Sequence, residues 1–236
     1  MVTTAIILAG GLGTRLKGTV PNLPKPMAPI NNRPFLEYQI DYWISQGITK
    51  FILSIGYLNE VIINHFGDKY KNVSIKYSIE STPLGTGGGL MLALKNQVEP
   101  VLVLNGDTFF KVDLEELSSF HFISKSKWTL SLFRTNQTTR YLNIKQASNG
   151  EILELKPEVK LSISSNLANG GVYLVEPSVF NLLDYKKGEK VSLEDDILSN
   201  LVDNSIKLFG KEFEGFFIDI GVPEDYYRAQ EFLSTK

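Results

Sequence analysis

Short apolar runs alternate with amphipathic segments through the first half of the chain. Residues 5–9 form a continuous apolar run that ends in glycine, which is typical of a strand buried on both faces. Residues 51–55, 73–79 and 101–104 are also strand-like, and segments with helical spacing lie between them. This alternation predicts a mainly parallel sheet whose strands are joined by right-handed helical crossovers.

Residues that favour helix ends predict where the first helices lie. Asn32 is expected to cap a helix that has Pro34 in its first turn and ends at Gly47. A shorter helix is expected to end near Gly67. In such folds ligands bind at the carboxyl ends of the strands, where the loops after the first and fourth strands lie.

The second half of the chain is richer in strands. Four strand-like segments and three helical patterns are expected there, the strands at 128–134, 141–145, 151–155 and 171–175 and the helices at 177–183, 193–202 and 223–233. No repeat or linker-like change of composition divides the sequence. We therefore expect one compact α/β domain over residues 1–236, with a β-rich second lobe.

Composition and charge exclude several classes of function. The chain has 24 basic and 26 acidic side chains, so its net charge of −2 gives no general attraction to nucleic acid or anionic membranes. It has no cysteine, which excludes thiolate catalysis and cysteine-bound metals. His65 and His121 are expected at the surface or at helix caps, without a catalytic role. The early apolar run is too short for a signal peptide, so a cytoplasmic protein is expected.

A glycine-rich loop follows the first strand. Residues 10–15 read GGLGTR, and Lys25 follows between two prolines. The N–H groups of a glycine turn can cradle phosphate oxygens, while Arg15 adds a bidentate fork and Lys25 a compact charge. Leu16 breaks the dinucleotide-binding fingerprint and so argues against an oxidoreductase, and Thr19 stands where a P-loop needs lysine. The segment therefore predicts a phosphate site of a different type.

The GGLGTR loop together with Pro-Lys-Pro resembles the signature of the sugar-1-phosphate nucleotidyltransferases. The resemblance implies a Rossmann-like α/β fold, with a mainly parallel mixed sheet, helices on both faces and a β-rich sugar-binding lobe. It also implies that a nucleoside triphosphate is joined to a sugar 1-phosphate, with release of pyrophosphate and with Mg²⁺ as cofactor. Residues 1–110 would bind the nucleotide and residues 111–236 the sugar phosphate. The nucleotide-binding residues implied in the first part are Leu8, Ala9, Gly10, Gly11, Gly13, Thr14, Arg15 and Lys25, of which Arg15 and Lys25 are also catalytic.

Two aspartates are expected at strand ends. Asp107 follows the run 101–104 closely, and Asp219 precedes Gly221, which breaks its strand. Carboxylates at such positions can hold Mg²⁺ against substrate phosphates, although an isolated aspartate in a turn is more often a cap. The resemblance assigns both residues to the metal, and Asp107 also to catalysis and to the nucleotide.

The segment 80–89 reads ESTPLGTGGG, and its glycine run is costly inside a helix, so taken alone it predicts a flexible loop. The resemblance implies that Gly85 and Thr86 pack against base and ribose, and that Glu80 contacts the base. A carboxylate can accept hydrogen bonds from both N1–H and N2–H of guanine, whereas uracil offers a single ring N–H. We therefore expect GTP rather than UTP.

The resemblance implies a second set of residues that bind the sugar phosphate: Gly106, Lys156, Asn169, Gly170 and Glu194. Leu155 stands where the family motif has an acid, which affects the role of that neighbour rather than that of Lys156. Ser192 followed by Asp195 also fits a helix cap, so Glu194 has a second interpretation.

Within the family, residues 23–30, 34–38 and 105–110 look most like the D-glycero-D-manno-heptose 1-phosphate guanylyltransferases of bacterial surface-polysaccharide pathways. The alternatives are a mannose 1-phosphate guanylyltransferase, a uridylyltransferase for an amino sugar, and a catalytically silent regulatory subunit. The presence of both Asp107 and Asp219 argues against a silent subunit, because binding alone does not require two carboxylates. The oligomeric state is not encoded in any motif of this sequence.

Overall fold

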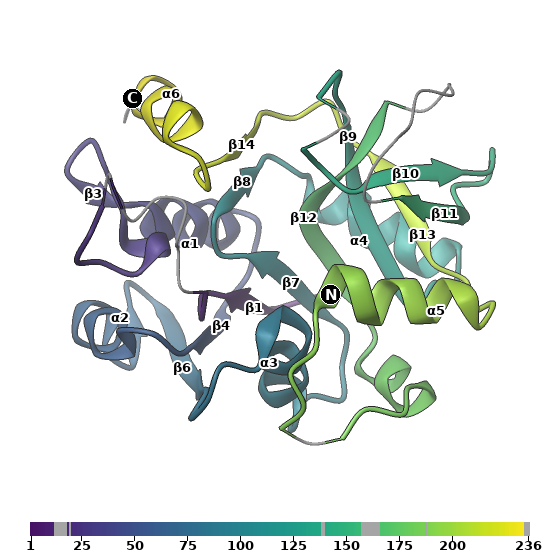
Figure 1. The fold of residues 1–236 in the computed structure, drawn as a ribbon, viewed down its shortest axis with the longest axis horizontal. Helices are drawn as coiled ribbons and strands as arrows, with labels where there is room; N and C mark the ends of the chain where they lie inside the picture. The colour runs from purple at the N-terminus through teal and green to yellow at the C-terminus, as the bar shows by residue number, and fades with distance from the viewer. Residues whose placement is uncertain (12–17, 19, 138–139, 157–165, 187, 234–236) are drawn as a thin grey trace.

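A mixed sheet runs through the centre of the molecule (Figure 1). The computed structural model describes residues 1–11, 18, 20–137, 140–156, 166–186 and 188–233. The parallel part of the sheet consists of β1 (Thr4–Leu8), β4 (Lys50–Ile55), β6 (Val73–Ile79) and β7 (Val101–Asn105). β1 lies between β4 and β7, so the loops after β1 and β7 leave the sheet side by side.

The sheet continues from the first half of the chain into the second. β12 (Leu167–Val175) pairs antiparallel with β7, and also with β9 (Trp128–Arg134) and β10 (Asn143–Gln146). The outer strands are β5 (Lys69–Tyr70) on β6, β11 (Ile152–Lys156) on β10 and β13 (Phe209–Glu212) on β9. Two short ladders stand apart: β2 (Pro29–Ile30) with β3 (Arg33–Pro34), and β8 (Thr108–Phe110) with β14 (Phe217–Asp219).

Helices cover both faces of the sheet. On one face, α1 (Phe35–Ser45), α2 (Asn59–Phe66) and α4 (Leu114–Ile123) contribute buried residues such as Trp43. On the other, the core contains residues of α3 (Gly85–Leu94), of the π-helical turn η3 (Leu193–Leu198) and of α5 (Ser199–Asp203). A third cluster packs α6 (Pro223–Phe232) against the start of α1 and β2. The expected α/β fold class is confirmed.

Most expected elements are present, and one expected cap is wrong. The four parallel strands lie within one residue of the predicted ranges, and Gly47 and Gly67 end α1 and α2 with positive φ angles of 96° and 60°. Asn32 does not cap α1, because it has a φ of 63° in the turn between β2 and β3 and Pro34 precedes the helix instead. Asparagine tolerates this left-handed turn conformation well.

The expected surface or cap position is right for His65 and wrong for His121. His65 is partly exposed and its Nε2 lies 2.7 Å from Glu37 Oε1. His121, expected at the surface or a cap, is fully buried, and its Nδ1 lies 2.8 Å from Thr129 Oγ1. It occupies the inner face of α4, an element that the hydrophobic pattern did not indicate.

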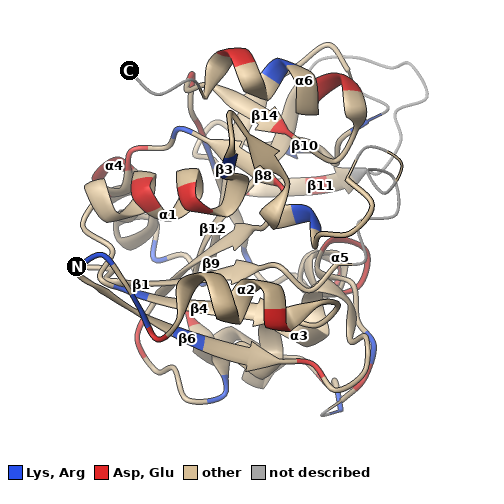
Figure 2. Cartoon of the chain, turned by 90° about the vertical axis from the view of Figure 1, so that its left-hand side faces the viewer, with Lys and Arg blue, Asp and Glu red and all other residues tan. Residues whose placement is uncertain are grey.

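The surface carries mixed charge. Figure 2 shows acidic positions on α1, α4 and α6 with basic positions interspersed among them, in keeping with the net charge of −2. No helix in the described part of the chain has the length and apolar character needed to span a membrane.

Candidate active site

A cavity of about 590 Å³ lies at the carboxyl ends of the parallel strands. It brings together most of the residues that the sequence indicated, from both halves of the chain. They are Leu8, Ala9, Gly10, Gly11, Lys25, Glu80, Gly85, Thr86, Gly106, Asp107, Asn169, Glu194 and Asp219. Gly106 has no room for a side chain, because a Cβ there would lie 2.4 Å from the carbonyl oxygen of Leu8, to which its own N–H donates.

A lysine and two aspartates meet at one side of this cavity. Lys25 lies in the short helix η1 (Lys25–Met27), and its Nζ is 2.5 Å from Asp107 Oδ2. Asp107 occupies the turn between β7 and β8, and Asp219 ends β14, which pairs with β8. Lys25 Nζ and Asp219 Oδ1 both lie 2.6 Å from the point that a Cβ on Gly221 would occupy. The three charged groups therefore face the same small volume.

The electrostatic environment of Asp219 shows how strongly charge is concentrated there. Burial, and then repulsion from the nearby Asp107 carboxylate, raise the pKa of Asp219, while Lys25 acts in the opposite direction. The N–H of Gly221 donates to Asp219 Oδ1 at 2.7 Å, which fixes the carboxyl group in its turn. Among the described residues, no group of three or more acidic or histidine side chains is arranged as a metal site. Asp107 and Asp219 are the carboxylates placed beside Lys25 in the described part of the chain.

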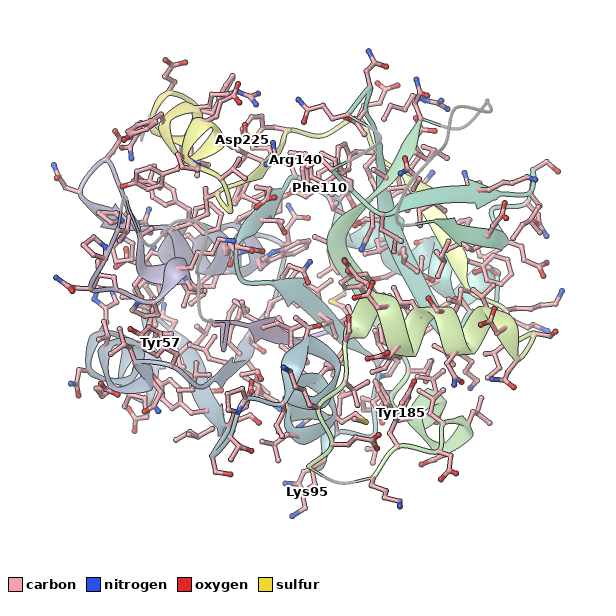
Figure 3. The ribbon with its side chains drawn as sticks, in the orientation of Figure 1. Tyr57, Lys95, Phe110, Arg140, Tyr185 and Asp225 are labelled. Atoms are coloured by element: carbon pink, nitrogen blue, oxygen red, sulfur yellow. The ribbon has the colours of Figure 1, made fainter. Side chains whose placement is uncertain are left out.

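Arg140 was missed by the sequence reasoning. Its guanidinium donates to the carbonyl oxygen and to Oδ2 of Asp219, each at 3.2 Å, and pairs with Asp225 Oδ2 at 2.5 Å. In Figure 3 it lies next to Asp225, at the start of α6. No local feature of the sequence marks Arg140, since its partners are about 80 positions away. Lys190 also lines the cavity and was missed as well.

Glu80 also lines the cavity and comes just after β6. The backbone N–H of Leu84 donates to Glu80 Oε2 at 2.9 Å. The side chain is half buried, and burial raises the pKa of Glu80 despite this hydrogen bond.

The glycine run after Glu80 is helical, which corrects the expectation of a flexible loop. α3 begins at Gly85, whose φ is 72°, and contains Gly87, Gly88 and Gly89. The N–H groups of Gly87 and Gly88 donate to the carbonyl oxygen of Val191, at 2.9 and 3.2 Å. Close packing against neighbouring backbone therefore explains why residues of poor helix propensity form this helix.

Asn169 and Glu194, which are joined by a hydrogen bond, line another part of the cavity. Asn169 Nδ2 donates to Glu194 Oε1 at 2.8 Å and to the hydroxyl of Tyr173 at 2.7 Å. Burial raises the pKa of Glu194. Ser192 caps η3, because its Oγ accepts the N–H of Asp195. The cap does not involve the side chain of Glu194, which lines the cavity.

Some of the predicted residues are not placed in the cavity. Gly170 is not among its lining residues, because it packs against Phe110, where a Cβ would be 2.4 Å from Cδ1. Its neighbour Gly171 lines the cavity instead. Gly13, Thr14 and Arg15 lie outside the described residues, as does the side chain of Lys156 at the end of β11. Their roles stay predictions.

Comparison with known proteins identifies the family of the chain. The D-glycero-alpha-D-manno-heptose 1-phosphate guanylyltransferase of Campylobacter jejuni is 44% identical over 223 residues, covering 94% of this chain and 96% of that protein. The enzyme of the same name from Aneurinibacillus thermoaerophilus is 42% identical, covering 97% of each. The crystal structure of HddC from Yersinia pseudotuberculosis complexed with GMP-PN has a TM-score of 0.84 and 31% identity, covering 99% of this chain and 100% of that one. The family described as nucleotidyl transferase matches residues 4–236. The chain belongs to the nucleotidyl transferase family.

Proposed function

We propose that this enzyme transfers GMP from GTP to D-glycero-α-D-manno-heptose 1-phosphate, forming a GDP-heptose and pyrophosphate. The names of the Campylobacter jejuni and Aneurinibacillus thermoaerophilus relatives support the substrates. The observation that carries the proposal is the meeting of Lys25, Asp107 and Asp219 in a cavity that also contains Glu80. One cavity thus combines groups for phosphate chemistry with a carboxylate suited to guanine.

The reaction needs charge compensation more than proton transfer. A phosphate oxygen of the sugar 1-phosphate attacks the α-phosphorus of GTP, and the bond from that phosphorus to the bridging oxygen of the β-phosphate breaks. The second pKa of a phosphate monoester is about 6, so the nucleophile is already anionic near neutral pH. The difficulty is repulsion between two anions, which positioning and preorganised positive charge overcome.

Lys25 is suited to this task because its ammonium is fixed where it lines the cavity. The side chain is 10% exposed, and its Nζ is held by Asp107. We assign Lys25 to the α-phosphate and the incoming phosphate. Arg15 and the loop N–H groups are assigned to the departing β- and γ-phosphates, and Lys156 to the sugar phosphate.

Asp107 and Asp219 fit a divalent cation, which we take to be Mg²⁺. This ion prefers oxygen ligands and is usually held by one or two carboxylates together with substrate phosphates and water. Burial, and then repulsion from Asp107, raise the pKa of Asp219, and a bound cation would offset that repulsion. When bound, the cation would neutralise phosphate charge and so lower the repulsion between the substrates.

Glu80 is assigned to the base and the pair Asn169–Glu194 to the sugar hydroxyls. A carboxylate accepts two hydrogen bonds from the N1–H and N2–H edge of guanine, which uracil cannot donate. Replacing Glu80 by glutamine should therefore reduce the preference for GTP over UTP, and an unchanged preference would exclude Glu80 as the base reader.

The decisive experiment measures pyrophosphate release from GTP, UTP, CTP and dTTP, each combined with heptose, mannose and N-acetylhexosamine 1-phosphates. The proposal requires the highest kcat/KM for GTP with the heptose phosphate. A maximum with mannose 1-phosphate would select the mannose alternative, and one with UTP and an amino sugar the uridylyltransferase. Absence of release in every combination would indicate a silent subunit.

A further inference from the structure

Two glycines from separate elements border the carboxyl group of Glu80. Gly10 follows β1, and Gly89 lies inside α3. A Cβ added at Gly10 would lie 2.5 Å from Glu80 Oε1, and one at Gly89 would lie 2.8 Å from the same atom. Carbon and oxygen atoms that are not bonded do not approach so closely. The carboxyl oxygen therefore occupies space that any larger residue at these positions would fill.

The other oxygen of the same carboxyl group is also fixed. Glu80 Oε2 accepts the N–H of Leu84 at 2.9 Å, so the group is held between this backbone donor and what we call the glycine gap, the space between Gly10 and Gly89. Each carboxylate oxygen has a second lone pair, and Glu80 lines the cavity. The group can therefore keep its support and still accept hydrogen bonds from a base.

Gly89 differs from the two glycines before it, because no backbone atom is among its three nearest neighbours. A glycine inside a helix lowers stability relative to alanine, so glycine is expected there where close packing leaves no room for a side chain. Gly87 and Gly88 have one in the backbone of Ser192 and Glu189, which a Cβ would approach to 3.1 and 2.7 Å. At Gly89 the three nearest atoms all belong to the side chains of Glu80 and Ser54.

We propose that Gly89, together with Gly10, is a specificity-determining position, because the glycine gap lets the Glu80 carboxylate stand where it reads the N1–H and N2–H edge of guanine. This inference rests on the proposed transfer of GMP. It extends that proposal to a residue of α3 that makes no hydrogen bond to the base and acts only through the position of Glu80.

The test is the substitution Gly89→Ala, compared with wild type on GTP and ITP. ITP lacks the N2 amino group of GTP, so the ratio of the two kcat/KM values reports the hydrogen bond to that group. The new methyl would meet the end of the Glu80 side chain and the hydroxyl of Ser54, at 2.8 and 2.9 Å, but none of its three nearest neighbours is a backbone atom, so the protein should still fold. The preference for GTP over ITP should fall roughly 10- to 100-fold, the usual value of a hydrogen bond to a charged group, chiefly through a higher KM for GTP.

Two comparisons separate this effect from a general disturbance. Gly56→Ala is the matched control, because a Cβ there would lie 3.4 Å from the Gly10 carbonyl oxygen and 3.6 Å from Glu80 Cβ, which is ordinary contact. It should keep the GTP to ITP ratio. In a Glu80→Gln background, Gly89→Ala should cause no further loss of the ratio, since the group it displaces is already altered. Gly10→Ala provides a second variant should Gly89→Ala fail to fold.

The outcomes distinguish this inference from the proposed function. If the wild type shows no preference for GTP over UTP, the proposed function fails. If the wild type prefers GTP and Glu80→Gln loses that preference, while Gly89→Ala and Gly10→Ala keep the GTP to ITP ratio, the glycine gap alone is overturned. A loss of the ratio that is equally large in the Glu80→Gln background also overturns it.

Discussion

At the scale of single residues, the backbone around Lys25 explains how a long side chain can act as a fixed charge. Pro24 and Pro26 restrict the chain on both sides, and the N–H of Met27 donates to the Pro24 carbonyl oxygen at 2.8 Å. The ion pair with Asp107 then holds the ammonium in place. Preorganised charge of this kind loses little free energy to rearrangement during the reaction.

Replacing Lys25 or Asp107 by alanine should therefore lower kcat by roughly 10²–10³-fold, the usual cost of removing one such contact. Initial rates of pyrophosphate release measure this loss, and circular dichroism checks that the variants fold. Lys207→Ala is a matched control, because Lys207 is exposed and pairs with Glu151, neither of which lines the cavity. Activity within tenfold of wild type would remove the assigned roles.

The burial of His121 predicts how the free energy of unfolding changes with pH. Burial, with a smaller contribution from Lys127, lowers the pKa of His121 to about 4. In the unfolded chain it is about 6.5, so as pH falls below 6.5 the unfolded state takes up the proton first and the folded state loses stability. The loss attributable to His121 should reach about 2 kcal/mol by pH 5 and be absent above pH 7.

The measurement compares urea unfolding of wild type and His121→Gln at pH 7.5 and pH 5. The glutamine stays neutral, so the stability of the wild type should fall relative to the variant as the solution is acidified. The comparison with a variant is needed because the raised pKa values of Glu80, Glu194 and Asp219 act in the opposite direction. A stability difference that does not change with pH would contradict the assignment.

At the scale of elements, α6 supports two sides of the site at once. The hydroxyl of Tyr226 donates to the carbonyl oxygen of Pro29 at 2.7 Å, which ties the helix to the chain just after Lys25. Asp225, in the first turn, holds Arg140 and through it Asp219. The helix thus fixes the lysine and one of the two aspartates relative to each other.

Asp225→Asn should lower the free energy of unfolding by about 2–3 kcal/mol, because it leaves the guanidinium of Arg140 with less compensation in a largely buried place. The Asp225 side chain is only 4% exposed. Asp41→Asn is the control. Asp41 pairs with Arg33 and Lys71, as Asp225 pairs with Arg140 and Arg228, but Asp41 is more exposed, so its loss should cost less than about 1 kcal/mol. If urea titrations give the same loss of unfolding free energy for both variants, the Asp225 contacts do not stabilise the protein more than the Asp41 contacts do.

The elements also show what the sequence can and cannot reveal. Strands buried on both faces are continuous apolar runs, so β1, β4 and β7 could be predicted within a residue, and glycine marked the ends of α1 and α2. The strand that ends at Asp219, β14, was expected, but β8 was not, because it has three residues and its pairing with β14 joins segments about 100 positions apart. α3 was missed because its glycines meet their partners, such as Val191, only in the folded chain. Arg140 escaped notice for the same reason.

At the scale of the whole molecule, the two halves share one sheet. β7 of the first half lies between β1 and β12, and β8 pairs with β14 near the end of the chain. Leu193 N–H also donates to Thr86 Oγ1 at 2.9 Å, which joins the start of η3 to α3. Residues 1–110 taken alone would leave β7 as an unpaired buried edge, so we expect the halves to unfold together rather than as separate domains.

The two tryptophans of the chain allow this cooperativity to be tested. Trp43 lies in α1 in the first half, and Trp128 begins β9 in the second; both are buried, in core clusters on opposite faces of the sheet. Trp128→Phe leaves a fluorescence probe in the first half, and Trp43→Phe leaves one in the second. For each variant, the midpoint of urea unfolding seen by the remaining tryptophan should coincide with the midpoint seen by far-ultraviolet circular dichroism, because loss of either half removes sheet partners from the other. A fluorescence transition clearly separated from the circular dichroism transition of the same variant would mean that the shared sheet does not couple the halves, and that the nucleotide and sugar sides fold as independent units.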